Sequence, residues 1–144
     1  MRIDGSCHCR NITFALDWQP DGETIPARVC SCSYCRMRGG VWTACPQGSL
    51  RVSIGNSAEV SPYRFDTETA DFHVCARCGD VPVVTCRIEG RLFAVVSVNA
   101  FDDFDPARLA HAPSNVEGEN EDARLARRER NWIGDVVFVA EGDR

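Results

Sequence analysis

The chain has 144 residues, a hydrophobic fraction of 44% and a formal net charge of −5. A chain of this length is expected to form one domain, 1–144, and its acidic balance without a basic run argues against nucleic-acid and anionic-membrane partners. No apolar run is long enough for a signal peptide or a membrane span, so a cytoplasmic protein is expected.

Short segments with strand-like patterns dominate the chain. Ile12, Phe14, Leu16 and Trp18 alternate with less apolar neighbours, which predicts a half-buried strand. Pro62 places a later strand at a sheet edge, because proline cannot donate to the ladder. The other predicted strands lie at 41–44, 50–54, 60–65, 81–88, 92–98 and 136–139.

One longer helix is predicted, at 119–130. Its acidic residues come first and its arginines last, which matches the helix dipole. Leu125 and Trp132 stand one heptad apart, as do Ala126 and Ile133, so the apolar stripe is narrow and predicts a charged helix lying on the sheet. The fold class is therefore mainly β, in a single domain, with a short C-terminal helix.

Seven of the nine cysteines fall into three tight clusters, and Cys45 and Cys86 stand alone. In a reducing compartment these thiols are not expected to pair as disulfides. Their number suits two zinc sites, one with four thiolates and one with three. The clusters are Cys7/Cys9, Cys30/Cys32/Cys35 and Cys75/Cys78.

The segment Cys75-x-x-Cys78-Gly79 predicts a zinc knuckle, because a tight turn points two sulfurs at one ion. A redox-active pair of the same spacing requires a following helix, whereas a valine-rich strand follows here. The knuckle needs two further ligands, which either Cys7 and Cys9 or the triplet could supply. The economical assignment is one site of Cys7, Cys9, Cys75 and Cys78.

The triplet Cys30, Cys32 and Cys35 would then hold a second zinc with one position open. Cys30 and Cys32 share a face if the segment is extended, and a turn brings Cys35 round to them. The fourth position could be filled by Cys45, Cys86, a histidine, water or a substrate. Cys86 lies on the core face of a predicted strand, and Cys45 is a weak candidate.

The histidines are left out of the predicted ligand set. His8 points away from its flanking cysteines in an extended segment, and His73 shares a face with Cys75, which suits a residue that supports a ligand. A lone histidine is more often structural or solvated than a metal ligand.

With these motifs, the chain resembles the glutathione-dependent formaldehyde-activating enzymes and the centromere-protein-V-like proteins. The resemblance covers about 5–103 and leaves a C-terminal extension at 115–144 without a matching motif. The matching segments are Gly5-Ser6-Cys7-His8-Cys9, Cys30-x-Cys32-Ser33-x-Cys35-Arg36 with Gly39, Phe72-x-x-Cys75-x-x-Cys78-Gly79, and Val98-Asn99-Ala100-Phe101-Asp102-Asp103.

The resemblance implies an all-β, tent-like fold of several short, coiled antiparallel sheets. It also implies a structural zinc on Cys7, Cys9, Cys75 and Cys78 and a catalytic zinc on Cys30, Cys32 and Cys35. The sulfur of glutathione would reach the second zinc and add to formaldehyde.

These expectations define a zinc-dependent carbon–sulfur lyase that reversibly joins a thiol to a small aldehyde. Arg36 and Arg38, beside the triplet, are the candidates for binding the glutathione carboxylates, since arginine forks match carboxylates. Two alternatives stay open: a non-catalytic two-zinc scaffold module, and a redox sensor that loses zinc on oxidation. The expected partners are small molecules, and the sequence does not give the oligomeric state.

Overall fold

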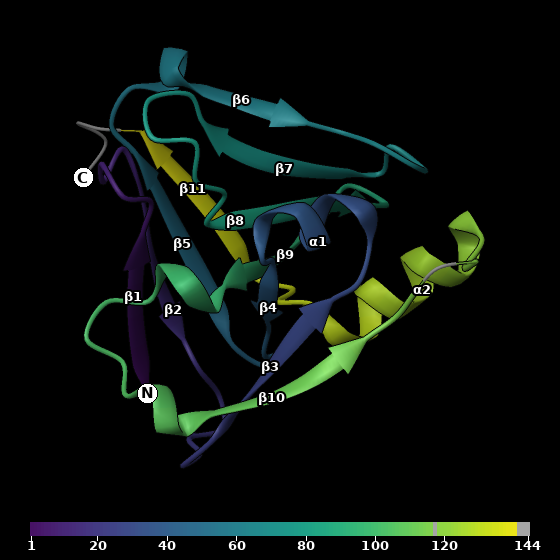
Figure 1. The fold of residues 1–144 in the computed structure, drawn as a ribbon, viewed down its shortest axis with the longest axis horizontal. Helices are drawn as coiled ribbons and strands as arrows, with labels where there is room; N and C mark the ends of the chain where they lie inside the picture. Colours follow the sequence, from purple (N-terminus) through teal and green to yellow (C-terminus); the bar gives the residue numbers. More distant parts are fainter. Residues whose placement is uncertain (117, 141–144) are drawn as a thin grey trace.

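The computed structural model describes residues 1–116 and 118–140, and it confirms the mainly β class (Figure 1). The predicted strands are present at nearly their predicted positions. β1, β7 and β10 are additions that the sequence pattern did not indicate, and β3 was expected only as an extended segment. The strands are β1 (Arg2–Ser6), β2 (Ile12–Asp17), β3 (Ile25–Cys30), β4 (Val41–Thr43), β5 (Ser49–Ile54), β6 (Val60–Tyr63), β7 (Ala70–Cys75), β8 (Val83–Ile88), β9 (Arg91–Ser97), β10 (Leu109–Ser114) and β11 (Val136–Ala140).

These strands form two sheets, of four and seven strands. The order in the smaller sheet is β1-β2-β5-β11, and the order in the larger is β10-β3-β4-β9-β8-β7-β6. Most neighbours are antiparallel, as expected, but β11 runs parallel to β5 and β10 runs parallel to β3. The parallel pairs arise because each joins segments separated by a long stretch of chain, so no tight hairpin fixes their direction.

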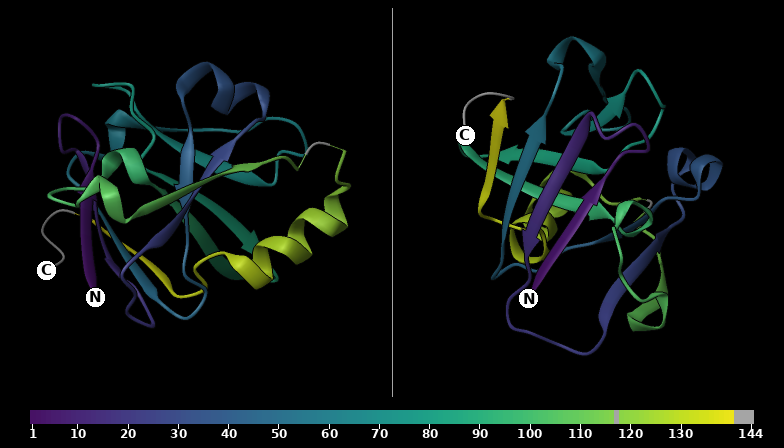
Figure 2. Two further views of the ribbon diagram at one scale, coloured as in Figure 1. Left: turned by 60° about the horizontal axis from the view of Figure 1, so that its bottom comes forward. Right: turned by 90° about the vertical axis from the view of Figure 1, so that its left-hand side faces the viewer.

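The hydrophobic core lies between the two sheets. Ile12, Leu16 and Val52 of the smaller sheet belong to the same buried cluster as Val83 and Val96 of the larger sheet. The strand β2 alternates buried and half-buried residues, which confirms its predicted period of two. The two views in Figure 2 show the sheets from different sides.

The described residues include two α-helices outside the sheets, and the shorter one was not predicted. Helix α1 (Ser33–Arg38) forms where the sequence indicated only a turn, and it ends at Gly39 in the left-handed conformation, with φ of 66°. Its brevity explains the difference, because six residues are too few for a helical periodicity to stand out.

Helix α2 (Glu121–Asn131) occupies the predicted position, and Asn120 caps it by accepting from the Ala123 amide at 2.8 Å. The buried side chains within the helix are Arg124 and Arg128, which the sequence did not indicate. Of the predicted apolar stripe, Trp132 and Ile133 are buried just after the helix, Leu125 is half-buried, and Ala126 is exposed. In Figure 1, β10 leads to α2 at one end of the molecule, far from the N-terminus. Within the described residues, no helix is long and apolar enough to cross a membrane.

Candidate metal centres and the pockets beside them

Four cysteines that are far apart in the sequence meet in one cluster. The sulfurs of Cys7, Cys9, Cys75 and Cys78 all lie within 4.8 Å of one another. Cys7 and Cys9 follow β1, and Cys75 ends β7, so the cluster joins the start of the chain to its middle. All nine cysteines are free thiols, and an all-sulfur group of four suits tetrahedral zinc.

The backbone around this four-cysteine cluster holds the sulfurs in place. The Gly79 amide donates to the Cys75 carbonyl at 2.7 Å, and the positive φ of 83° at Gly79 permits this tight turn. On the other side, the Ile12 amide donates to the Cys7 sulfur at 3.3 Å. Such donors stabilise thiolates, which is the form that binds a metal.

The thiols of this cluster differ in acidity. Burial raises the pKa of Cys7 to about 12. Burial also opposes ionisation of Cys78, but hydrogen bonds from the backbone amides of Asp80 and Cys9, together with the thiols of Cys75 and Cys7, outweigh it and lower the pKa of Cys78 to about 7. A metal ion that binds here must therefore displace protons, as zinc does at thiolate sites.

The triplet also comes together, on the first turn of α1. The sulfurs of Cys30, Cys32 and Cys35 lie within 4.8 Å of one another. Cys30 ends β3, and Cys32 is the helix cap, whose sulfur accepts from the Cys35 amide at 3.4 Å. The indole Nε1 of Trp42 on β4 donates to the Cys35 sulfur at 3.3 Å. The turn that the sequence predicted is thus the start of a helix.

The three thiols of the triplet differ in pKa. The hydrogen bond from the Cys35 thiol, helped by the positive charge of Arg127, lowers the pKa of Cys30 to about 5 against the effect of burial. The same hydrogen bond and burial raise the pKa of Cys35, and burial raises that of Cys32. Cys30 is therefore the thiol of the triplet that ionises first.

The structure does not bring a fourth donor to the triplet. Within 1–116 and 118–140, no further histidine, cysteine or carboxylate joins the group. The buried Cys45 lies instead with its sulfur 3.8 Å from the Asp17 carbonyl, and the buried Cys86 accepts from Arg128 at 3.4 Å. The core position expected for Cys86 is confirmed.

Neither of the histidines near the four-cysteine cluster belongs to a cysteine group. The side chain of His8 is exposed, and its backbone amide donates to Asp80 at 2.8 Å. Nε2 of His73 lies 2.7 Å from Oγ1 of Thr85, and its ring packs against Phe138 with the centroids 5.2 Å apart.

A pocket of about 160 Å³ is lined by all three triplet cysteines. Its floor is largely apolar, with Ala70, Phe72, Val84 and Val95 from the larger sheet, and Trp132 after α2 also lines it. The sequence interpretation missed its cationic side, although Arg28 stands two residues before Cys30 and Arg124 and Arg128 are four apart on a helix. The arginines that line this triplet pocket are Arg28, Arg124, Arg127 and Arg128.

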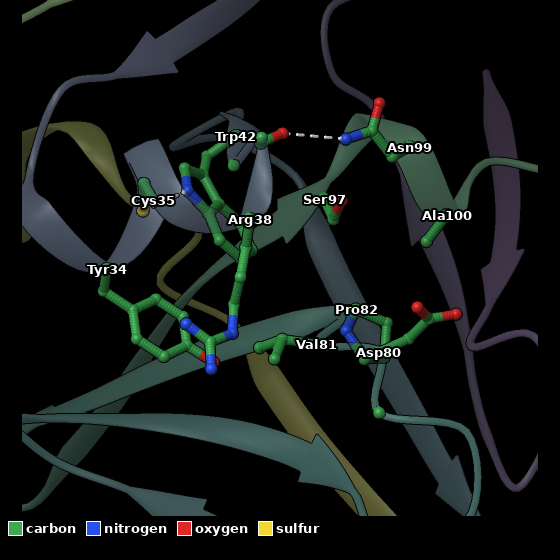
Figure 3. Close-up of a pocket in the computed structure, with 13 residues that line it drawn as sticks. Tyr34, Cys35, Arg38, Trp42, Asp80, Val81, Pro82, Ser97, Asn99 and Ala100 are labelled. Atoms are coloured by element: carbon green, nitrogen blue, oxygen red, sulfur yellow. Dashed lines mark hydrogen bonds between the residues drawn. The ribbon is translucent and has the colours of Figure 1, made fainter.

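A second pocket, of about 270 Å³, lies between α1 and the loop that follows Cys78 (Figure 3). Cys35 lines both pockets. Arg38 lines the second pocket, with its guanidinium 4.2 Å from the centre of the Tyr34 ring. Arg36 is exposed and is absent from the lining of both pockets. The assignment of Arg36 and Arg38 to glutathione stays a prediction.

The chain is similar to a known protein family and to a solved structure. The profile of a family described as "Glutathione-dependent formaldehyde-activating enzyme" matches residues 2–115. A crystal structure of a protein from Rhodobacter sphaeroides is similar, with 29% sequence identity and a TM-score of 0.59 over 76% of this chain and 97% of that one. No curated protein sequence matches.

Proposed function

Since the chain belongs to the family of glutathione-dependent formaldehyde-activating enzymes, we propose that it reversibly joins a small thiol, such as glutathione, to a small aldehyde, such as formaldehyde. The proposed enzyme is a carbon–sulfur lyase acting in the cytoplasm, where nine free thiols would stay reduced. Its substrates are small molecules, and no macromolecular partner is needed.

In this proposal the two cysteine groups hold two zinc ions with different roles. Cys7, Cys9, Cys75 and Cys78 offer four sulfurs and suit a closed, structural ion. Cys30, Cys32 and Cys35 offer three, which suits a catalytic ion with one position left for substrate. Bound at the triplet, zinc would keep a substrate thiol in its nucleophilic, deprotonated form.

The observation that carries the proposal is the triplet with three sulfurs and a pocket beside it. A purely structural zinc site is almost always completed by four protein ligands. Here the described residues supply three, and the pocket of about 160 Å³ gives a small molecule access to the same sulfurs. Cys45, the alternative ligand weighed from the sequence, lies elsewhere in the core.

The reaction conserves atoms and electrons without a redox partner. The substrate sulfur forms a bond to the carbonyl carbon, the π electrons of the C=O bond move to oxygen, and the proton lost by the thiol ends on that oxygen. The reverse steps release the aldehyde. The protein's residues hold the reactants together: Trp42 steadies the Cys35 sulfur, and the apolar floor excludes bulk water.

Native mass spectrometry of the purified chain, with and without glutathione, tests the proposal. We expect two zinc ions per chain and a glutathione adduct that forms in the wild type and in the matched Cys45→Ala variant. Cys32→Ser should lose the adduct, because it removes one of the three triplet sulfurs. Exchange NMR should then show that formaldehyde and glutathione interconvert with their hemithioacetal faster with the protein than without it, because this adduct also forms without a catalyst.

Other outcomes identify the alternatives. Two bound zinc ions without an adduct of any thiol would indicate a non-catalytic scaffold module. Loss of the second zinc in Cys45→Ala would mean that the triplet site is closed. Zinc release by low concentrations of peroxide, without aldehyde chemistry, would indicate a redox sensor.

A further inference from the structure

Four arginines line the cationic side of the triplet pocket, and the described residues supply carboxylate partners for two of them. Nη1 of Arg124 lies 2.6 Å from a carboxylate oxygen of Asp66, and Nε of Arg127 lies 3.0 Å from Glu119. Within the described residues, the other two arginines of the pocket, Arg28 and Arg128, form no ion pair. Two guanidinium groups therefore lie beside the cysteines without a carboxylate partner among the described residues.

Arg128 is the more unusual of the two, because only 7% of its surface is exposed. Its Nη1 donates to Oγ1 of Thr69 at 2.9 Å and to the sulfur of Cys86 at 3.4 Å, and its guanidinium lies 4.9 Å from the Trp132 ring centre. Its Nε is buried and has no hydrogen-bond acceptor in the part of the chain that the structure describes. A buried cation without a carboxylate is costly, so an acceptor from outside the chain would complete this arrangement.

Arg28 lines the same pocket but belongs to β3, whereas Arg128 belongs to α2. Arg28 lies on β3 two residues before Cys30, so both side chains point to the same face of that strand, and both are half-buried. The exposed Val29 between them points the other way. The pocket thus has an unpaired arginine on β3, another on α2, and the triplet sulfurs in its lining.

We propose that Arg28 and Arg128 bind the carboxylate of a substrate whose reacting end lies at Cys30, Cys32 and Cys35. The role of the reacting end rests on the proposed function, whereas the carboxylate subsite rests on the two unpaired arginines. A carboxylate is the ligand because guanidinium forks match its two oxygens, and the small, apolar remainder of the pocket suits a compact molecule. The carboxylate could belong to the thiol or to the aldehyde.

The subsite would make this chain selective within its family. The family profile matches residues 2–115, so it includes Arg28 and ends before α2, which supplies Arg128. The C-terminal segment is then a specificity element that closes one side of the pocket, rather than a charged helix that only covers the sheet.

Calorimetric titration of the zinc-loaded full chain with matched pairs of small probes tests the subsite. Thioglycolate and 2-mercaptoethanol are thiols with and without a carboxylate; glyoxylate and glycolaldehyde are the corresponding aldehydes. We expect the charged member of at least one pair to bind about tenfold tighter or more, the factor that a charge-assisted hydrogen bond supplies. The pair that shows the preference identifies the substrate that carries the carboxylate.

Arg28→Gln and Arg128→Gln should each remove most of this preference. The matched control is Arg130→Gln, which changes an exposed arginine of the same helix outside the pocket and should retain it. If Arg128→Gln does not fold, Arg28→Gln decides. Equal binding of charged and uncharged probes to the wild type, or an equal loss in Arg130→Gln, would overturn the subsite.

A cobalt-substituted sample separates this proposal from the proposed function. Thiol binding at the metal changes the absorption of tetrahedral Co²⁺. If thiols change the spectrum without any preference for a carboxylate, the proposed function stands and the subsite is wrong. If carboxylates bind through Arg28 and Arg128 but no thiol changes the spectrum, the subsite stands and the thiol chemistry is wrong.

Discussion

The indole N–H of Trp42 donates to the sulfur of Cys35 at 3.3 Å, across the gap between β4 and α1. Cys35 is the buried member of the triplet, so this donor reaches a sulfur that bulk water does not solvate. A hydrogen bond from outside the ligand set fixes the orientation of a thiolate and stabilises its charge. Trp42 is therefore a positioning residue for the triplet.

Trp42→Phe should weaken zinc binding at the triplet by about tenfold, because it removes the donor and keeps most of the ring. Competition with a chromophoric chelator measures the zinc affinity of the triplet in the zinc-loaded protein. Trp18→Phe is the control: Trp18 is a similarly large core side chain and lines neither pocket. Unchanged affinity in Trp42→Phe would show that the hydrogen bond does not support the metal.

Gly40→Ala should displace Cys35. A Cβ on Gly40 would lie 2.8 Å from Cβ and 2.9 Å from Sγ of Cys35, closer than real side chains approach. Two hydrogen bonds restrict movement of the backbone at Gly40. The Gly40 amide donates to the Cys35 carbonyl at 2.9 Å, and the Gly40 carbonyl accepts from the Cys30 amide at 3.2 Å. Overpacking of this kind costs roughly 1–3 kcal/mol.

The measurement for Gly40→Ala is the zinc content after dialysis against a mild chelator. We expect one zinc per chain instead of two, with the four-cysteine cluster still loaded. Gly22→Ala is the matched control, since its added Cβ would meet the nearest atom, the Thr24 carbonyl, at an ordinary 3.4 Å. Retention of both ions in Gly40→Ala would mean that the triplet tolerates the shift.

Cys75→Ser tests the four-cysteine cluster. Cys75 is completely buried, and its sulfur lies 3.5 Å from that of Cys9, so the substitution removes a central donor. A structural zinc contributes on the order of 10 kcal/mol, which is comparable to the whole stability of a domain. We expect loss of one zinc and of cooperative thermal unfolding, whereas Cys86→Ser, at a buried cysteine outside both groups, should keep both ions. A folded Cys75→Ser protein with two zinc ions would contradict this grouping.

The grouping of the cysteines shows what spacing can predict. The knuckle Cys75-x-x-Cys78 needs two further zinc ligands. The sequence offered both Cys7/Cys9 and the triplet, and Cys7/Cys9 was preferred only because it is the more economical assignment. The structure brings Cys7 and Cys9 to the knuckle because β1 ends beside the end of β7, a long-range arrangement that no local pattern encodes. The strands of the core were predictable because the alternation of apolar residues within each strand is a local pattern.

The arginines show where the sequence interpretation failed. A run of arginines on a helix normally indicates a solvated face, and the narrow stripe through Leu125 supported that interpretation. In the structure Arg124 and Arg128 are the buried residues of α2. Arg124 pairs with Asp66 and Arg128 donates to Thr69. Both partners are distant in sequence, so periodicity alone could not reveal the burial of the two arginines.

Glu119→Gln should destabilise α2, because Glu119 precedes the helix and binds two of its arginines. The Glu119 carboxylate accepts from Nε of Arg127 at 3.0 Å and from its Nη2 at 3.2 Å, and it lies 3.5 Å from Nε of Arg124. Burial opposes the ionised form, but the two arginines outweigh it and lower the pKa of Glu119. Stability from a carboxyl with a lowered pKa is present above its ordinary pKa and is lost only as the pH falls through the lowered value.

The effect of Glu119→Gln should therefore be constant across the neutral range. We expect a loss of about 1 kcal/mol in the free energy of unfolding, typical of a partly exposed ion pair with good geometry, and faster amide exchange in α2. Urea denaturation and hydrogen exchange measure the two effects. Glu129→Gln, on the exposed face of the same helix, should change neither. An equal loss in both variants would mean that overall charge, not the Glu119 contacts, stabilises the helix.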